Sequence, residues 1–174
     1  MKGVIFKPAT GSSTHMKAIF EAIGNAQTNY NWLITNIDAY PYEKKYIEMF
    51  RMNCSDGTKN HVWLTGDELT AIIDEDNFQW CFAVLSGFPE NVTEEQALGC
   101  DSLPYADGYE GFWSNPISIQ HPMAEIEIAP WDCLFTLIIS RNDNIAADAM
   151  AASSLSEDLE NYNNNPRPLH ITNN

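Results

Sequence analysis

Two strand-like segments near the C-terminal end constrain the fold more than any other feature of the sequence. Residues Ala124–Ile128 alternate strictly between apolar and acidic side chains, so an extended chain here would have one apolar and one acidic face. Pro130–Asp132 then predicts a turn, and Leu134–Ser140 is a second, mainly apolar run. Two such segments joined by a short turn predict an antiparallel hairpin. We therefore expect this part of the chain to form part of a β-sheet.

The rest of the chain alternates between strand and helix patterns joined by short connections. Apolar or β-branched runs between turn residues predict strands over residues 3–6, 31–40, 61–64 and 79–88. Apolar spacing and capping residues predict helices over 16–23 and 42–52, after Thr65 and Thr93 (which open T-x-x-E and T-x-x-Q patterns), and from Asn142 to Ala152. Together these patterns favour an α+β fold with a mainly antiparallel sheet, a C-terminal hairpin and helices packed on one face.

Length and composition favour one domain. The chain has 174 residues, of which 44% are hydrophobic, and single domains commonly have about 100–200 residues. No internal repeat or linker divides the sequence. We therefore expect a single α+β domain over residues 1–160 and a polar, frayed tail over residues 161–174.

The charge of the chain is strongly unbalanced, with 9 Lys and Arg against 24 Asp and Glu and a formal net charge of −15. Because binding to phosphate groups depends on clustered cations, the sequence predicts neither nucleic acid nor an anionic membrane as a partner. An acidic surface instead accelerates encounters with basic proteins. A basic protein partner is therefore one expectation, and acidity that serves only solubility is the other.

The N-terminus and the cysteines predict a cytoplasmic protein. The apolar run in MKGVIFKPAT is shorter than the roughly 7–15 apolar residues of a signal peptide. Cys54, Cys81, Cys100 and Cys133 form no C-x-x-C pair. In the cytoplasm cysteines stay reduced, so we expect Cys81 and Cys133 to be small core residues.

Three residues near the predicted hairpin are candidates for catalysis. His121, Glu125 and Glu127 share parity along one extended run, so their side chains could face the same way. Such a set could hold a divalent metal or act as an acid and a base, with Asp107 or Asp132 nearby, which suggests a small hydrolase. The alternative is a solvated face of an antiparallel sheet. Because the chain has no H-E-x-x-H motif, phosphate-binding glycine loop or nucleophile elbow, we predict no cofactor and no metal site.

Aromatic and acidic residues just before this run are candidates for binding. The candidate binding residues are Tyr105, Asp107, Tyr109, Phe112, Trp113 and Trp131. Such side chains can hold a cationic or flat ligand, anchor a protein partner, or close one end of the hydrophobic core. A pocket rimmed by Trp113 and Trp131 would suit a small molecule.

Several strings in the sequence resemble a family of small cytoplasmic proteins of unknown function from Bacillus-type Firmicutes. Among them are NYNWLI (29–34), FQWCFAVLSGFP (78–89), YADGYEGFW (105–113) and NPISIQHPMAEIEIAPWD (115–132). The likeness spans most of the chain and is weakest over residues 42–59 and the tail. It implies a bacterial origin, and it carries over no activity and no catalytic residue. The sequence therefore predicts a non-enzymatic interaction module, comparable to an inhibitor or immunity protein. A small hydrolase and a small-molecule-binding protein are the alternatives.

Overall fold

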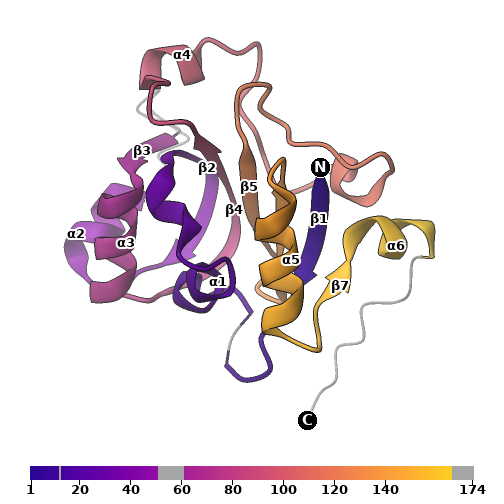
Figure 1. Cartoon of the computed structure of the whole chain (residues 1–174). Coiled ribbons are helices and arrows are strands. Elements are labelled where there is room, and N and C mark those ends of the chain that lie inside the picture. Colours follow the sequence, from indigo (N-terminus) through magenta and orange to yellow (C-terminus); the bar gives the residue numbers. More distant parts are fainter. Residues whose placement is uncertain (12, 51–60, 166–174) are drawn as a thin grey trace.

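The computed structural model describes residues 1–11, 13–50 and 61–165 (Figure 1). Its strands are β1 (Lys2–Phe6), β2 (Asn31–Tyr40), β3 (His61–Thr65), β4 (Gln79–Phe88), β5 (Ile126–Trp131), β6 (Phe135–Ser140) and β7 (Glu157–Asp158). Its α-helices are α1 (Met16–Ala22), α2 (Lys44–Phe50), α3 (Gly66–Glu75), α4 (Glu94–Leu98), α5 (Asp143–Ala152) and α6 (Leu159–Asn164). Two short 3-10 helices are η1 (Ala26–Asn29) and η2 (Glu110–Trp113).

Within the described residues, the seven strands form one sheet in the order β3-β2-β4-β5-β6-β1-β7. Every neighbouring pair of strands is antiparallel. The predicted α+β fold with a mainly antiparallel sheet is therefore confirmed. The first strand, β1, lies between β6 and β7, so the N-terminal and C-terminal parts of the chain meet in the same region of the sheet.

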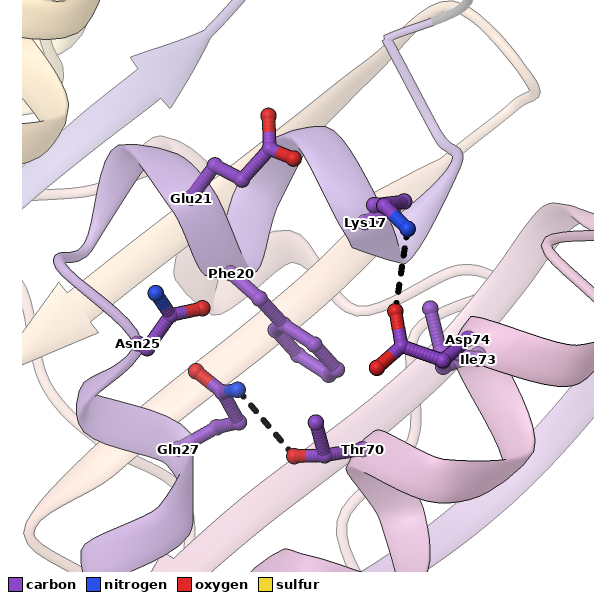
Figure 2. Close-up of a pocket in the computed structure, with 8 residues that line it drawn as sticks. All are labelled: Lys17, Phe20, Glu21, Asn25, Gln27, Thr70, Ile73 and Asp74. Atoms are coloured by element: carbon purple, nitrogen blue, oxygen red, sulfur yellow. Dashed lines mark hydrogen bonds and ion pairs between the residues drawn. The ribbon is translucent and has the colours of Figure 1, made fainter.

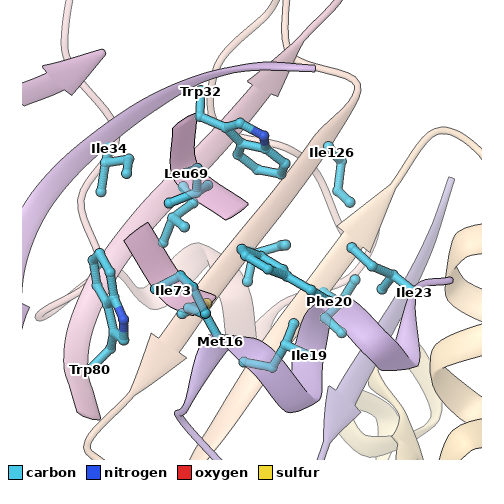
Figure 3. Packing of buried hydrophobic residues seen from close by; sticks show 14 of the residues in the cluster. Met16, Ile19, Phe20, Ile23, Trp32, Ile34, Leu69, Ile73, Trp80 and Ile126 are labelled. Carbon is cyan, nitrogen blue, oxygen red and sulfur yellow. The ribbon is translucent and has the colours of Figure 1, made fainter. Parts of the chain in front are cut away.

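Helices α1, α2, α3 and α5 cover one face of the sheet. Figure 1 shows α1 between α3 and α5. Figure 3 shows Phe20 of α1 and Ile73 of α3 near the strand residues Trp32 and Ile126, all buried in one core cluster. Apolar residues recur every three or four positions along these helices and so line the side that faces the sheet. This is the helix-covered face that the sequence predicts.

The opposite face of the sheet is also covered, by α4, η2, α6 and the irregular chain between α4 and β5. A second cluster of buried residues lies there, and it includes Phe88, Phe112, Phe135 and Leu159. The central strands are therefore buried on both sides, which accounts for the nearly continuous apolar sequence of β4.

Helices α3 and α4 begin where the sequence patterns predict. The Thr65 hydroxyl oxygen accepts the Glu68 N–H at 3.2 Å, and the Glu68 carboxylate accepts the Thr65 N–H at 2.8 Å. Thr93 and Gln96 make the same reciprocal pair at the start of α4, at 3.3 and 2.9 Å. Each capping box satisfies backbone N–H groups that a helix start otherwise leaves without partners.

The predicted hairpin forms from β5 and β6, but its turn lies further along the chain than expected. Strand β5 continues to Trp131, which pairs with Phe135. The turn instead contains Asp132 and Cys133, whose φ angles are 50° and 56°. Consecutive positive φ values match the right-handed twist of the strands, as in the primed hairpin turns. Pro130 therefore belongs to the strand and not to the turn.

The C-terminal boundary also differs from the expectation. Helix α6 runs from Leu159 to Asn164, so residues 161–164 are helical and part of the fold. Leu159 is fully buried in the second cluster, and the Asn163 side-chain amide donates to the Phe112 carbonyl at 3.1 Å. Residues 166–174 of the predicted tail lie outside the described residues, as do the last two residues of the helix predicted over 42–52.

Candidate functional site

The predicted aromatic binding residues form one connected cluster on the second face of the sheet. Ring centroids lie 5.2 Å apart for Tyr105–Tyr109, 4.9 Å for Tyr109–Phe112, 5.8 Å for Phe112–Trp131 and 5.1 Å for Trp113–Trp131, all edge to face. Phe112 is 1% exposed, whereas Tyr105 is 47% exposed. Most of the cluster therefore closes the second core, and Trp113 and Trp131 pack against each other. Tyr105 is the member whose ring is exposed.

The loop that carries Tyr105 and Asp107 is fixed to the sheet by side-chain hydrogen bonds. Asn36 of β2 has a φ of 49°, and its Oδ1 accepts the backbone N–H groups of Ala106 at 2.7 Å and Asp107 at 2.9 Å. The side-chain amide of Gln120 makes two hydrogen bonds with the Tyr105 backbone, each 3.0 Å long. The backbone that carries the exposed Tyr105 and Asp107 side chains is therefore held in place.

His121 is a structural residue rather than a ligand or a base. Its side chain is buried, its Nε2 donates to the Ala97 carbonyl at 2.9 Å, and its Nδ1 accepts the Met123 N–H at 3.2 Å. Burial lowers the pKa of His121, although the bond to Ala97 partly opposes this. A neutral ring with both nitrogens engaged has no lone pair to offer a metal or a substrate proton.

Glu125 and Glu127 do not complete a site with His121. Glu125 is exposed, and Tyr30, whose pKa is raised first by burial and then by the charge of Glu125, packs on the helix-covered face. Glu127 is buried, and Tyr109, whose pKa is raised first by burial and then by the Glu127 carboxylate, packs on the opposite face. Among the described residues, no three His, Cys, Asp or Glu side chains gather closely enough to hold a metal ion. The structure therefore does not bring the predicted hydrolase residues together.

Glu127 is buried because the second face of the sheet is covered, so the alternation of Ala124–Ile128 does not mark a solvated face. One carboxyl oxygen accepts the Gln120 N–H at 3.0 Å, and the other has no hydrogen-bond partner within the described part of the chain. Ser86, directly opposite on β4, is also buried, and its hydroxyl likewise lacks a described partner. Burial raises the pKa of Glu127 to about 7, and contacts with Gln120 offset this only in part. Such a group is neutral over much of the pH range in which surface carboxylates are charged.

The prediction that Cys81 and Cys133 stay reduced is wrong for this structure, in which they form a disulfide. Cys81 lies on β4 and Cys133 in the hairpin turn after β5. The Cys133 N–H also donates to the Cys81 carbonyl at 3.3 Å, so the turn lies against the neighbouring strand. Cys100, the free cysteine of the described residues, is half-buried.

A pocket of about 130 Å³ lies on the other side of the molecule, between α1, η1 and α3 (Figure 2). Phe20 and Ile73, which are 3% and 1% exposed, form its apolar floor. Its polar lining comes from Lys17, Glu21, Asn25, Gln27, Thr70 and Asp74. The pocket thus combines an aromatic surface with oxygen atoms that come from three separate elements.

Gln27 is the least satisfied polar side chain of this pocket. The residue is fully buried, and its Nε2 donates to the Thr70 hydroxyl at 3.1 Å. The Thr70 hydroxyl in turn donates to the Gly66 carbonyl at 2.7 Å, so it has no proton left for Gln27. The Gln27 Oε1 has no hydrogen-bond partner among the described residues. A buried acceptor without a donor costs roughly 1–3 kcal/mol, so this oxygen marks a place where a donor is missing.

The charges around the pocket are acidic with one cation at the edge. Lys17 Nζ lies 3.0 Å from Asp74 Oδ1, and the hydrogen bond and the charge of Asp74 raise the pKa of Lys17. Both side chains of this pair are at least half exposed, so the pair contributes little to stability. Glu21 adds a second carboxylate at the rim. Asp148 of α5 also lies close by, since a β-carbon at Gly24 would be 3.9 Å from its Oδ2.

Sequence patterns gave only faint signals for this pocket. Lys17 and Glu21 are four residues apart on α1, as are Thr70 and Asp74 on α3, and residues at this spacing share a helix face. These pairs reveal polar faces on two helices, but not that the faces meet. Gln27, which lies in η1 between them, has no pattern that distinguishes it from a surface residue.

In comparisons with known proteins, no protein-family model, no curated protein and no solved structure matches the chain. Among the described residues, no helix is both long and apolar enough to cross a membrane.

Proposed function

We propose that the protein is a non-enzymatic binding module that recognises a basic protein, in the manner of an inhibitor or immunity protein. The observation that carries this proposal is that most of the lysine side chains in the described residues are paired with acidic side chains. Lys7, Lys17, Lys44 and Lys45 each form an ion pair with an acidic side chain. Arg141 donates to the carbonyls of Ala124 and Pro122. Among the described residues, the charges of these four lysines are thus compensated locally, and the acidic surplus of the chain remains to attract a partner.

The acidic side chains of α1, α3 and α5 support a docking surface on the helix-covered side. Glu21 and Asp74 are exposed there and line the pocket of Figure 2, and the exposed Asp148 of α5 lies close to Gly24. A surface of one charge sign accelerates association with an oppositely charged partner, and the effect weakens as salt increases. The exposed Tyr105 and Asp107 form a second, smaller candidate surface on the opposite face.

The cytoplasmic location predicted from the sequence belongs to this proposal as well. The disulfide between Cys81 and Cys133 argues in the other direction, because such bonds persist mainly in oxidising compartments. Thiol trapping in intact cells, followed by mass spectrometry of the two cysteines, would decide between the two locations. A trapped disulfide would contradict the cytoplasmic assignment.

A pull-down from a native lysate at low ionic strength tests the proposed function. The bait would be the wild type or a double variant, Glu21→Lys with Asp148→Lys. A control with the same change in net charge is Glu90→Lys with Asp101→Lys, since both residues are exposed and lie on other elements. We expect a basic protein in stoichiometric amount with wild type and the control, but not with the helix-face variant. Failure to recover any stoichiometric basic protein would contradict the proposal.

A further inference from the structure

The unsatisfied oxygen of Gln27 defines what the pocket between α1, η1 and α3 can bind. Because Thr70 already donates to Gly66, the hydrogen bond from Gln27 Nε2 fixes the amide with Oε1 on the other side. Figure 2 shows this oxygen turned away from Thr70 and toward Asn25. An amide oxygen can only accept hydrogen bonds. A ligand that completes the pocket must therefore donate a hydrogen bond at this point.

The charges of the pocket favour a cationic donor. Asp74 and Glu21 both line the pocket, with the Glu21 carboxylate turned outward at the rim (Figure 2), and Asp148 of α5 lies close to Gly24. A hydrogen bond from a charged donor is stronger than one from a neutral group. Lys17 supplies one positive charge at the edge, but Asp74 already compensates it.

The floor of the pocket suits the same kind of group. The Phe20 ring lies near the centre of the residues drawn in Figure 2, and Ile73 lies next to Asp74 on α3. A cation over the face of an aromatic ring is attracted by the ring quadrupole, and an alkyl stem can rest on the isoleucine. A volume of about 130 Å³ leaves room for a head group and a short stem rather than a large ligand.

We propose that this pocket binds a small cationic group with N–H donors, a guanidinium or primary ammonium on an alkyl stem. The inference deepens the proposed function, and it rests on that function for the source of the cation, which would be an Arg or Lys side chain of the basic partner. A free amine or guanidine has the same chemistry and is the other source. Gln27 Oε1 accepts one N–H, the carboxylates at the rim compensate the charge, and Phe20 contacts the face of the group.

A titration with methylguanidinium tests the chemistry directly, with methylurea as the neutral molecule of the same shape. Binding is followed by NMR through the side-chain amide signals of Gln27 and Asn25. We expect saturable binding of methylguanidinium and at least about tenfold weaker binding of methylurea, because only the former carries a charge. Equal binding of the two molecules, or no saturable binding of methylguanidinium, would overturn the proposal.

Two variants separate this site from non-specific attraction to an acidic protein. Gln27→Leu removes the acceptor at similar volume, and we expect it to weaken methylguanidinium binding about tenfold or more. Thr70 keeps its bond to Gly66 in this variant, so the fold should survive. Lys17→Met changes an exposed residue and removes the competing cation, so it should strengthen the binding severalfold. If Lys17→Met instead weakened binding, or Gln27→Leu left it unchanged, the pocket would not be a cation site.

Capped tripeptides with a central arginine distinguish the two sources of the cation. If the peptide and methylguanidinium both shift the Gln27 signals, the pocket accepts a side chain of a protein. If only methylguanidinium does, the ligand is a free small cation. Both outcomes support the cation site, whereas the pull-down described above tests the partner separately. If the pull-down recovers a basic protein but methylguanidinium does not bind, the proposed function is supported and the cation site in this pocket is contradicted.

Discussion

Glu127 on β5 and Ser86 on β4 are directly opposed in the sheet, and both are buried. Each has a side-chain oxygen that is not hydrogen bonded to any described residue. Exposed sheet faces place acidic side chains in water, but this carboxyl group lies beneath the aromatic cluster. The fold therefore keeps an ionisable group in an environment that favours its protonated form.

The stability of the protein should fall as Glu127 ionises. Burial raises the pKa of Glu127 from 4.5 to about 7, so between these values the native state holds a proton that the unfolded state has lost. As pH rises through this window, the free energy of unfolding therefore decreases by about 3 kcal/mol for this group. Above the window this contribution is constant. Glu127→Gln cannot ionise, so its unfolding free energy should exceed that of wild type above pH 7 and approach it near pH 4.5.

Urea denaturation at several pH values measures this difference. Glu125→Gln is the matched control, because Glu125 lies two residues earlier and is exposed. We expect the difference between Glu125→Gln and wild type to be independent of pH. A Glu127→Gln variant whose stability tracks wild type at every pH would show that Glu127 is charged in the folded protein.

Each ring of the aromatic cluster should contribute to the free energy of unfolding according to how deeply that ring is buried. Phe112→Ala removes a ring that is 1% exposed and should lower the free energy of unfolding by about 3–5 kcal/mol. Tyr105→Ala removes an exposed ring and should cost less than about 1 kcal/mol. Chemical denaturation of both variants checks this. If Phe112→Ala were as stable as wild type, the cluster would not close the second core.

Reduction of the Cys81–Cys133 disulfide should destabilise the protein. The bond closes a loop with a sequence separation of 52 residues, for which the chain-entropy model gives about 4 kcal/mol. Cys133→Ser should lower the melting temperature under oxidising conditions and abolish its dependence on reductant. Cys100→Ser, at a free cysteine, is the control and should behave as wild type. If the melting temperature of wild type is the same with and without reductant, the disulfide does not form.

Gly66 should be essential for the contact between α3 and η1. A β-carbon at this position would overlap the Gln27 carbonyl oxygen and lie 2.7 Å from Thr28 Cα, so the backbone would have to move. We expect Gly66→Ala to cost about 1–3 kcal/mol. It should also shift the NMR signal of the Trp32 indole N–H, which donates to the Gln27 carbonyl at 2.9 Å.

Gly99→Ala provides the comparison for Gly66→Ala. The nearest atom to a β-carbon at Gly99 is the Gln96 carbonyl oxygen at 3.3 Å, and the φ of Gly99 is −75°. An alanine fits there with little movement, so we expect a change within about 0.5 kcal/mol. Similar losses for both variants would show that the clash at Gly66 is not what limits the substitution.

Local patterns predicted the elements of the fold well because the forces behind them are local. Strands β2 and β4 match the predicted ranges 31–40 and 79–88, and the capping boxes of Thr65 and Thr93 place the starts of α3 and α4. These signals depend on side chains within a few positions of each other. They need no knowledge of the rest of the chain.

The candidate sites were harder to predict because they depend on distant contacts. The disulfide requires the strand register that pairs Phe82 with Trp131 and so brings Cys133 to β4. The burial of Glu127 requires the irregular chain that covers the second face of the sheet. The sequence of that chain has no periodic hydrophobic pattern. The Gln27 pocket requires two helices and a 3-10 turn to meet.

The position of β1 has a consequence for synthesis on the ribosome. Lys2 pairs with Ser140 and Val4 with Asp158, so within the described residues β1 has sheet neighbours only in β6 and β7, which are translated much later. During translation, the apolar residues of β1 therefore have no strand partner until β6 and β7 have been synthesised. Such a strand is open to pairing with other nascent chains. The sheet can therefore be completed only after β6 and β7 have emerged from the ribosome.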